Sequence, residues 1–136
     1  MSATKKIFIT GASGGIGTAI CDKFLINGYN LIMTSSSEEK LLFLKNKYGE
    51  KHHYYKVNFS DANNLQKCLD LVSKEHKDIS VIANNAGTTQ DSLIFRMKDE
   101  QWSKVIQTNL NSNYQIIKSL LPNMLSNKYG KIIGIS

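Results

Sequence analysis

Short apolar runs alternate with amphipathic stretches along this sequence, and that alternation constrains its fold more than any other feature. The first run, Lys6 to Thr10, is stopped by a glycine and is typical of a strand buried on both faces. Apolar residues then recur every four positions at Ile16, Ile20 and Phe24 until Gly28, which indicates a helix and its end. Further strands are predicted over residues 30–34, 53–57, 79–83 and 131–135.

Three more helices are predicted between these strands. Ser36 to Glu39 has capping-box spacing and opens a helix that Gly49 closes. Asp61 can cap the next helix, whose apolar stripe is Leu65, Leu69 and Val72. One long helix is expected from Asp99 to about Asn127, with Pro122 bending its last turns. Its apolar residues are Trp102, Val105, Ile106, Leu110, Ile117, Leu120 and Leu121.

This order of elements predicts the fold class. Strands that alternate with helices over short connections form a parallel sheet with right-handed crossovers and helices on both faces. We therefore expect an α/β, doubly wound, Rossmann-like sheet in which a fifth strand is the last element of residues 1–136. In such sheets ligands bind beyond the carboxyl ends of the strands, where the winding reverses. The loops after the first and fourth strands should line that crevice.

The composition supports a packed globular chain and excludes several classes of protein. Of the 136 residues, 41% are hydrophobic and 21% are charged, and 17 Lys and Arg against 11 Asp and Glu give a net charge of +6. The lysines are scattered as on a solvated surface, so no nucleic-acid partner is expected. No apolar run approaches the roughly 18 residues of a membrane span. Two cysteines without C-x-x-C spacing suggest a reducing cytoplasm, and no metal site is expected.

The loop after the first strand carries the clearest chemical signal, Thr10-Gly11-Ala12-Ser13-Gly14-Gly15-Ile16-Gly17. Gly11 permits a tight turn, Gly15 lets backbone amides approach a phosphate, and Gly17 allows the helix to pack near the strand. The helix that starts here presents unpaired N–H groups to an anion such as a dinucleotide diphosphate. Glycines also end strands for purely structural reasons, but the strand, turn and helix context favours the nucleotide site. Thr18 excludes a Walker loop, which has Lys and then Ser or Thr after its last glycine.

The spacing Thr-Gly-x-x-x-Gly-x-Gly, together with Asn84-Asn85-Ala86-Gly87 after the fourth strand, resembles the short-chain dehydrogenase/reductase family. Asp78-Ile79, Thr108-Asn109-Leu110 and the segment 130–136 also look like this family, so the resemblance covers the whole chain. Within the family, residues 85–102 most resemble the 3-oxoacyl-(acyl-carrier-protein) reductases of bacterial fatty-acid synthesis.

The resemblance implies a role for particular residues. Gly11, Ser13, Gly15, Ile16 and Gly17 match the phosphate loop, and Asn85, Ala86 and Gly87 match the segment behind the adenosine ribose. Asn58 stands where an Asp often contacts adenine, and its carbonyl can still accept from an adenine amino group. Asn109 matches the catalytic Asn, which in the family bends the long helix and holds a water in a proton relay. It can also be read simply as a polar residue on a helix flank.

Residues at the end of the second strand distinguish NAD from NADP, because an acidic residue there would accept a hydrogen bond from the 2′-hydroxyl of NAD. Here the stretch is Thr34-Ser35-Ser36-Ser37, without a carboxylate. The hydroxyls of Ser35 and Ser36, with nearby amides, can hold the 2′-phosphate of NADP, so NADPH is the expected cofactor. Against this, Gly14 stands where many NADP-using relatives carry Arg, and no Arg follows the second strand.

The family completes its active site with a Ser after the fifth strand and with a Tyr and a Lys four residues later on the next helix. No such set is matched in residues 1–136, since the pair Tyr114 and Lys118 lies inside the long helix and is interpreted as a chance match. The chain is therefore expected to be the N-terminal part of one NAD(P)-binding domain and to have little activity by itself, because a reduced carbonyl needs an acid to protonate it.

The expected function of the full-length protein is NADPH-dependent reduction of 3-oxoacyl groups on acyl carrier protein. The carrier is acidic in this pathway, which suits a net charge of +6, and Lys128 stands where the resembling reductases have a basic residue thought to meet it. A homotetramer packed through the long helix is expected by the same resemblance. Two alternatives remain open: a short-chain dehydrogenase acting on a sugar, steroid or simple alcohol, and a non-catalytic nucleotide-binding module.

Overall fold

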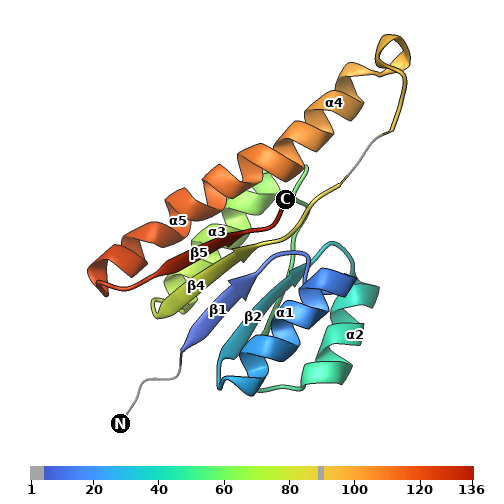
Figure 1. The fold of residues 1–136 in the computed structure, drawn as a ribbon. Helices are drawn as coiled ribbons and strands as arrows, with labels where there is room; N and C mark the ends of the chain where they lie inside the picture. Colours follow the sequence, from blue (N-terminus) through green and yellow to red (C-terminus); the bar gives the residue numbers. More distant parts are fainter. Residues whose placement is uncertain (1–4, 89–90) are drawn as a thin grey trace.

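The computed structural model describes residues 5–88 and 91–136 and has a five-stranded parallel sheet at its centre (Figure 1). The strand order is β3-β2-β1-β4-β5, and all four neighbouring pairs are parallel. The strands are β1 (Lys6–Ile9), β2 (Asn30–Ser35), β3 (His53–Lys56), β4 (Ile79–Asn84) and β5 (Lys131–Gly134). The predicted fold class and all five predicted strands are confirmed.

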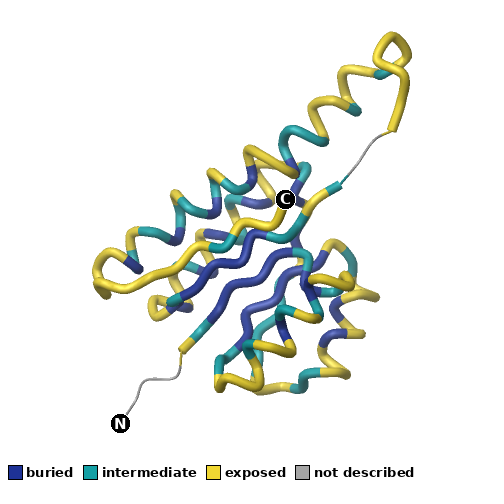
Figure 2. The backbone as a smooth tube through the Cα atoms, in the orientation of Figure 1, coloured by how far each residue is buried: buried dark blue, intermediate teal, exposed yellow. Residues whose placement is uncertain are grey.

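Helices cover both faces of the sheet, which makes it doubly wound. The helices α1 (Gly15–Ile26) and α2 (Glu38–Tyr48) pack on one face, and α3 (Ala62–Glu75) and α5 (Ser112–Ser126) pack on the other. A separate apolar core lies on each side, and β1, β2 and β4 are buried along most of their length (Figure 2). By contrast, β5 is largely exposed.

The first helix faces the sheet with smaller residues than the sequence predicts. Gly17 and Cys21 are the buried residues of α1, whereas Ile16, expected on the apolar stripe, is 59% exposed. The glycine brings the helix close to the loop after β1, and the neighbouring Ile16 is then rotated by about 100° away from the core. Burial raises the pKa of Cys21 to about 12 and that of Cys68 to about 11, so both thiols stay protonated at neutral pH.

The second and third helices are capped by side chains. Ser37 caps α2 by accepting from the Lys40 N–H at 3.2 Å, one residue later than the predicted box that starts at Ser36. The reason is that β2 continues to Ser35 and leaves Ser36 as the connection. Asp61 caps α3 as predicted, accepting from the N–H groups of Asn63 and Asn64. The stripe of Leu65, Leu69 and Val72 is buried.

The long helix predicted from Asp99 is present as a continuous run over Asp99–Ser126, but residues 107–111 within it are π-helical rather than α-helical. A single 3-10 turn, η1 (Ile94–Arg96), precedes α4 (Asp99–Ile106), which continues through a π-helical segment, η2 (Gln107–Asn111), into α5. The buried residues of α5 are Ser112, Ile116, Leu120 and Met124, while Trp102 and Leu110 of the predicted stripe are mostly exposed. A π turn holds more residues than an α turn, so it shifts the face that the following helix presents to the sheet.

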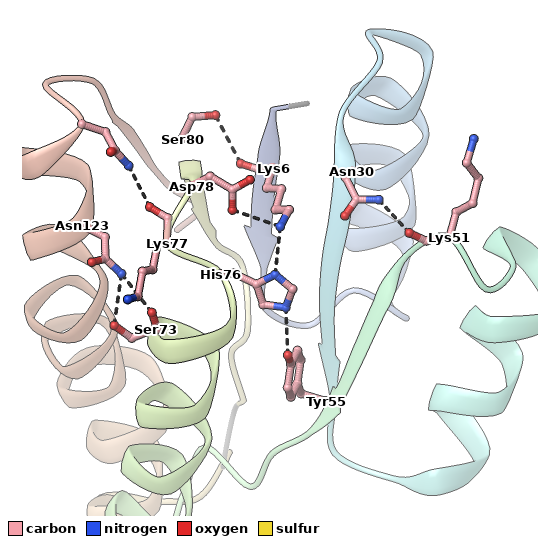
Figure 3. Close-up of polar contacts among 11 residues, drawn as sticks. Lys6, Asn30, Lys51, Tyr55, Ser73, His76, Lys77, Asp78, Ser80 and Asn123 are labelled. Carbon is pink, nitrogen blue, oxygen red and sulfur yellow. Dashed lines mark hydrogen bonds and ion pairs between the residues drawn. The ribbon is translucent and has the colours of Figure 1, made fainter. Parts of the chain in front are cut away.

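A polar network of side chains lies near the end of the sheet where β1 begins (Figure 3). The cleft described below lies at the other end, where the strands finish. His76, only 3% exposed, accepts at Nδ1 from Lys6 Nζ at 3.2 Å, and its Nε2 lies 2.9 Å from the Tyr55 hydroxyl. Lys6 also pairs with Asp78 at 3.0 Å. Burial, with the nearby His53 and Lys6, lowers the pKa of His76 to about 4, so its ring is neutral at pH 7. This network ties β1, β3 and the end of α3 together.

None of the helices in the described ranges combines the length and the apolar character needed to cross a membrane.

Candidate functional site

The winding of the sheet reverses between β1 and β4, and a cleft of about 740 Å³ opens beyond the carboxyl ends of these strands. Its walls come from the segments that follow β1, β2, β3 and β4 and from the helix that runs through α4 and η2. Every residue predicted to contact a cofactor lies on its wall: Gly11, Ser13, Gly15, Ile16, Gly17, Ser35, Ser36, Asn58, Asn85, Ala86 and Gly87. The remaining lining residues are Gly14, Lys40, Phe59, Ser60, Thr88, Lys104 and Thr108.

The start of α1 faces this cleft with unsatisfied donors. Gly14 is the N-cap residue and has no side chain that could cap the helix. The N–H groups of Gly15, Ile16 and Gly17 have no hydrogen-bond partner within the described parts of the chain. A Cβ added at Gly15 would meet no atom within 4 Å. The site therefore offers several amides and open space to an anion.

Two glycines of the same loop serve close packing instead. Gly11 has φ +63°, and a Cβ there would lie 3.1 Å from the Cα of Ala86. A Cβ at Gly17 would overlap the carbonyl oxygen of Gly11. The loop after β1 thus lies directly against the loop after β4, and glycines are needed at both points.

Thr10 and Asn85 join these two loops. The Thr10 hydroxyl, buried at the end of β1, accepts from the N–H groups of Asn85 and Ala86, both at 2.9 Å. The Asn85 side chain donates to the Gly11 carbonyl at 3.2 Å. The sequence places Thr10 at the start of the glycine-loop motif but gives it no role of its own. Both residues position the glycine loop, and the Asn85 amide is committed to the protein.

The end of β2 forms another wall. Ser35 Oγ lies 3.1 Å from Ser13 Oγ, so a pair of hydroxyls connects this strand to the glycine loop. Lys40, from the first turn of α2, lines the cleft together with Ser35 and Ser36. The acidic residues that precede it are not on the wall, and Glu38 lies 3.9 Å from Lys56.

The charge of the cleft comes from two lysines that sequence reasoning missed. Lys40 and Lys104 are the charged residues among those that line it, and none of the lining residues is Asp or Glu. Lys40 has a weak sequence signal, because it follows the capping Ser37 by three residues and so lies in the first turn of α2. Lys104 has none, since α4 is far from the other walls in sequence. A positive cleft suits a ligand with several phosphates.

Asn58 lies on the wall, but its carbonyl is engaged. Its Oδ1 accepts from the Ser60 hydroxyl at 2.6 Å and from the Ser60 N–H at 3.1 Å. These bonds use the acceptor that was expected to meet an adenine amino group. The Asn58 side-chain NH₂ group has no partner among the residues described around it and is the group left for a ligand.

Asn109 lies behind the cleft, within η2. Its Oδ1 accepts from the Thr88 N–H, and its Nδ2 donates to the Thr88 carbonyl, both at 2.8 Å. This reciprocal pair ties the loop after β4 to the π-helical segment. Asn109 does not itself line the cleft. It contacts Thr88, which does.

Three other residues of interest lie outside the cleft. Lys118 Nζ sits 5.7 Å from the centroid of the Tyr114 ring on the surface of α5, which fits a chance pairing of the two types. Lys128 is exposed and has φ 55° in the turn between α5 and β5. Thr89 and Gln90, which belong to the segment 85–102 discussed above, lie outside the described residues.

Comparison with known proteins places the chain among enzymes of one family. The family model described as short chain dehydrogenase matches residues 5–136. The chain is 35% identical over 131 residues to the 3-oxoacyl-(acyl-carrier-protein) reductase of Haemophilus influenzae, covering 96% of this chain and 54% of that protein. It is 40% identical over 132 residues to the corresponding reductase of Rickettsia felis, covering 97% and 53%. The chain thus spans about half the length of the curated relatives it matches.

Solved structures agree with this placement. A metagenomic short-chain oxidoreductase, crystallised in complex with NADP, superposes with a TM-score of 0.88 at 29% identity and matches 97% of this chain and 62% of its own. A short-chain dehydrogenase from Streptomyces avermitilis superposes with a TM-score of 0.90 at 24% identity, over 100% of this chain and 50% of its own, which supports the fold.

Proposed function

This chain belongs to the short-chain dehydrogenase family, and on that premise we propose that it forms the cofactor-binding part of an NADPH-dependent 3-oxoacyl-(acyl-carrier-protein) reductase. The curated relatives described above support this substrate class. The observation that carries the cofactor assignment is the cleft itself, in which open helix amides and two lysines meet without any carboxylate.

The residues present fit a nicotinamide dinucleotide phosphate. In our proposal the N–H groups of Gly15, Ile16 and Gly17 bind the diphosphate, because the open space at Gly15 lets it approach the helix. Ser35 and Ser36 lie at the end of β2, where side chains contact the adenosine ribose in folds of this kind. The Asn58 amide group is placed for the adenine, and Ala86 and Gly87 for the face of the adenosine.

The chemistry then divides between the cofactor and the protein. When bound, NADPH supplies a hydride to a ketone carbon. This chain binds and orients the dinucleotide, with Thr10 holding the glycine loop in place against the loop after β4. We assign Asn109 a positioning role through Thr88, which borders the cleft. The proton donor of the reaction is expected outside residues 1–136, as the resemblance implies.

The partner and setting follow from the same proposal. An acidic acyl carrier protein suits the net charge of +6, and Lys128 is exposed in a turn where it can meet such a carrier. We propose a homotetramer in the cytoplasm for the whole protein. In this arrangement the substrate arrives at the carboxyl ends of the strands, on the side of the cleft.

The test is steady-state turnover by the whole protein. With NADPH, it should reduce an acetoacetyl thioester with a higher kcat/KM than simple ketones. With NADP⁺, it should oxidise sugars, steroids and secondary alcohols poorly. Preferred turnover of one of those alcohols would instead indicate another activity of the same family. Binding of NADPH without turnover of any of these substrates would indicate a nucleotide-binding module.

A further inference from the structure

The wall of the cleft that follows β3 offers a ligand hydrogen-bond donors rather than acceptors. We propose that this wall binds the purine base of the dinucleotide through the acceptor atoms of the base, so that a 6-oxopurine such as hypoxanthine is bound as well as adenine. The inference rests on the proposed function, because it concerns the base of the proposed cofactor. It extends that function to a second class of nucleotide, the 6-oxopurine dinucleotides.

Asn58 can donate to a ligand but can no longer accept from one. The Ser60 N–H, which can only donate, lies 3.1 Å from Asn58 Oδ1, and the Ser60 hydroxyl donates to the same oxygen at 2.6 Å. These bonds fix which end of the Asn58 amide is the oxygen, and they occupy both of its lone pairs. An asparagine distinguishes adenine by accepting from its amino group while it donates to a ring nitrogen. Only the donating half of that pair is left at Asn58.

Two further donors belong to the same wall. The N–H group of Phe59, which lines the cleft, makes no hydrogen bond within residues 5–88 and 91–136. Lys104 and Ser60 both line the cleft and also a neighbouring groove, which places the lysine at this wall. The Lys104 ammonium group has no ion pair or hydrogen bond in the same ranges. Glu100, one turn earlier on α4, lines that groove but not the cleft.

The group at C6 of the purine decides how well a base matches such a wall. The edge that carries C6 and N7 presents two acceptors in a 6-oxopurine, whereas adenine presents one acceptor and a donating amino group. Lysine is a common partner of the two-acceptor edge. At this wall the adenine amino group therefore finds no free amide carbonyl, while O6 of hypoxanthine can accept from Asn58 or Lys104. NADPH remains a ligand, because the adenine ring nitrogens still accept.

The experiment compares NADPH with deamino-NADPH, which carries hypoxanthine in place of adenine and is otherwise the same molecule. Calorimetric titration of the full chain gives the dissociation constant of each. The dissociation constant of deamino-NADPH should be less than about three times that of NADPH, where a threefold difference is the size of one net hydrogen bond. A larger ratio would overturn the inference and leave the proposed function standing. If the chain binds neither dinucleotide, the proposed function fails as well.

Three variants change the donors and acceptors of this wall, and the ratio of the two dissociation constants is the quantity compared. Asn58→Asp supplies a second acceptor oxygen and should shift the ratio toward NADPH by about tenfold, the size of a charge-assisted hydrogen bond. Ser60→Ala frees one lone pair of the Asn58 carbonyl and should shift the ratio in the same direction by about threefold. Lys104→Ala removes a donor and should weaken deamino-NADPH more than NADPH.

Asn63→Asp is the matched control. It adds the same charge in the first turn of α3, but Asn63 is exposed and does not line the cleft, so the ratio should stay as in the unmodified chain. An unchanged ratio in Asn58→Asp or in Lys104→Ala would overturn the inference, and so would an equal shift in Asn63→Asp. Asn58 and Lys104 are also exposed, so their variants should fold, which circular dichroism checks.

Discussion

At the scale of single residues, two glycines that are two positions apart, Gly15 and Gly17, have opposite surroundings. Gly15 faces open space, and Gly17 lies against the Gly11 carbonyl. A side chain at Gly15 should therefore enter the cleft without disturbing the fold. We expect Gly15→Val to keep the melting temperature of the protein and to abolish NADPH binding in a titration, since the new methyl groups occupy the proposed diphosphate space.

The matched variant is Gly17→Ala. Its single methyl group would overlap backbone atoms of the loop, so we expect a loss of about 1–3 kcal/mol in the free energy of unfolding, measured with urea. Unchanged NADPH affinity in Gly15→Val would contradict the assignment of the phosphate loop. A fully stable Gly17→Ala protein would contradict the close approach of α1.

His76 makes a second prediction at the same scale. Its folded pKa of about 4 lies below the usual 6.5, so the unfolded chain binds more protons between these values. The stabilising contribution is complete above pH 6.5 and is lost as the pH falls toward 4. One histidine with this shift accounts for at most about 3 kcal/mol of unfolding free energy.

The measurement is urea unfolding as a function of pH for the unmodified protein and for His76→Gln. We expect the difference between the two proteins to shrink as the pH falls, because Gln does not titrate. His52 and His53 also have lowered pKa values owing to burial, so the variant keeps part of the pH dependence. A difference that is constant with pH would show that His76 does not titrate in this way.

At the scale of elements, the π-helical segment η2 connects the long helix to the cleft. Asn109 ties it to Thr88 by two hydrogen bonds of 2.8 Å. Asn109→Ala should cost about 1–2 kcal/mol of stability and speed hydrogen exchange at the Thr88 amide, because both bonds are lost. NADPH affinity should fall as the loop after β4 loosens.

Asn127→Ala is the control for this prediction. The Asn127 side chain also donates to a backbone carbonyl, that of Lys77 at 2.7 Å, but it lies far from the cleft at the other end of α5. We expect a loss of stability with unchanged NADPH affinity. Equal effects of the two variants on NADPH binding would mean that Asn109 has no special connection to the site.

Some secondary-structure elements could be predicted from local sequence patterns, and others could not. Strands, helix caps and the glycine loop depend on neighbouring residues, and the sequence places all five strands, the Asp61 cap and the cofactor-lining loops correctly. The π-helical segment Gln107–Asn111 has no signal in the hydrophobic periodicity, and only the resemblance, through Asn109, implies a bend there. The π-helical segment shifts which face of α5 meets the sheet. The apolar stripe predicted for a regular α-helix therefore includes residues, such as Leu110, that are exposed in the structure.

At the scale of the whole molecule, α4, η2 and α5 carry three large apolar side chains that the described parts of the chain leave exposed. Trp102, Leu110 and Tyr114 are 59%, 63% and 65% exposed. Leu110 and Tyr114 follow the buried Thr108 and Ser112 by two residues, which places them on the opposite side of the helix. Exposed apolar residues on one face are typical of an interface between protein chains.

We therefore expect Trp102→Ser to lower the mass of the proposed tetramer in sedimentation experiments, because it removes the largest apolar side chain of that face. Ile26→Ser, which changes an 82% exposed residue at the end of α1, should leave the mass unchanged. A monomeric unmodified protein, or a tetramer that tolerates Trp102→Ser, would contradict the proposed assembly.

The sequence alone determined the α/β order, the parallel sheet and the glycine loop with its open helix amides, because periodicity, capping and glycine spacing act over a few residues. The tertiary structure decided which lysines line the cleft, that Asn109 contacts Thr88, and that His76 is buried between Lys6 and Tyr55. These contacts join residues 21 to 70 positions apart. Such distances are closed only when the sheet assembles, so no local pattern encodes them.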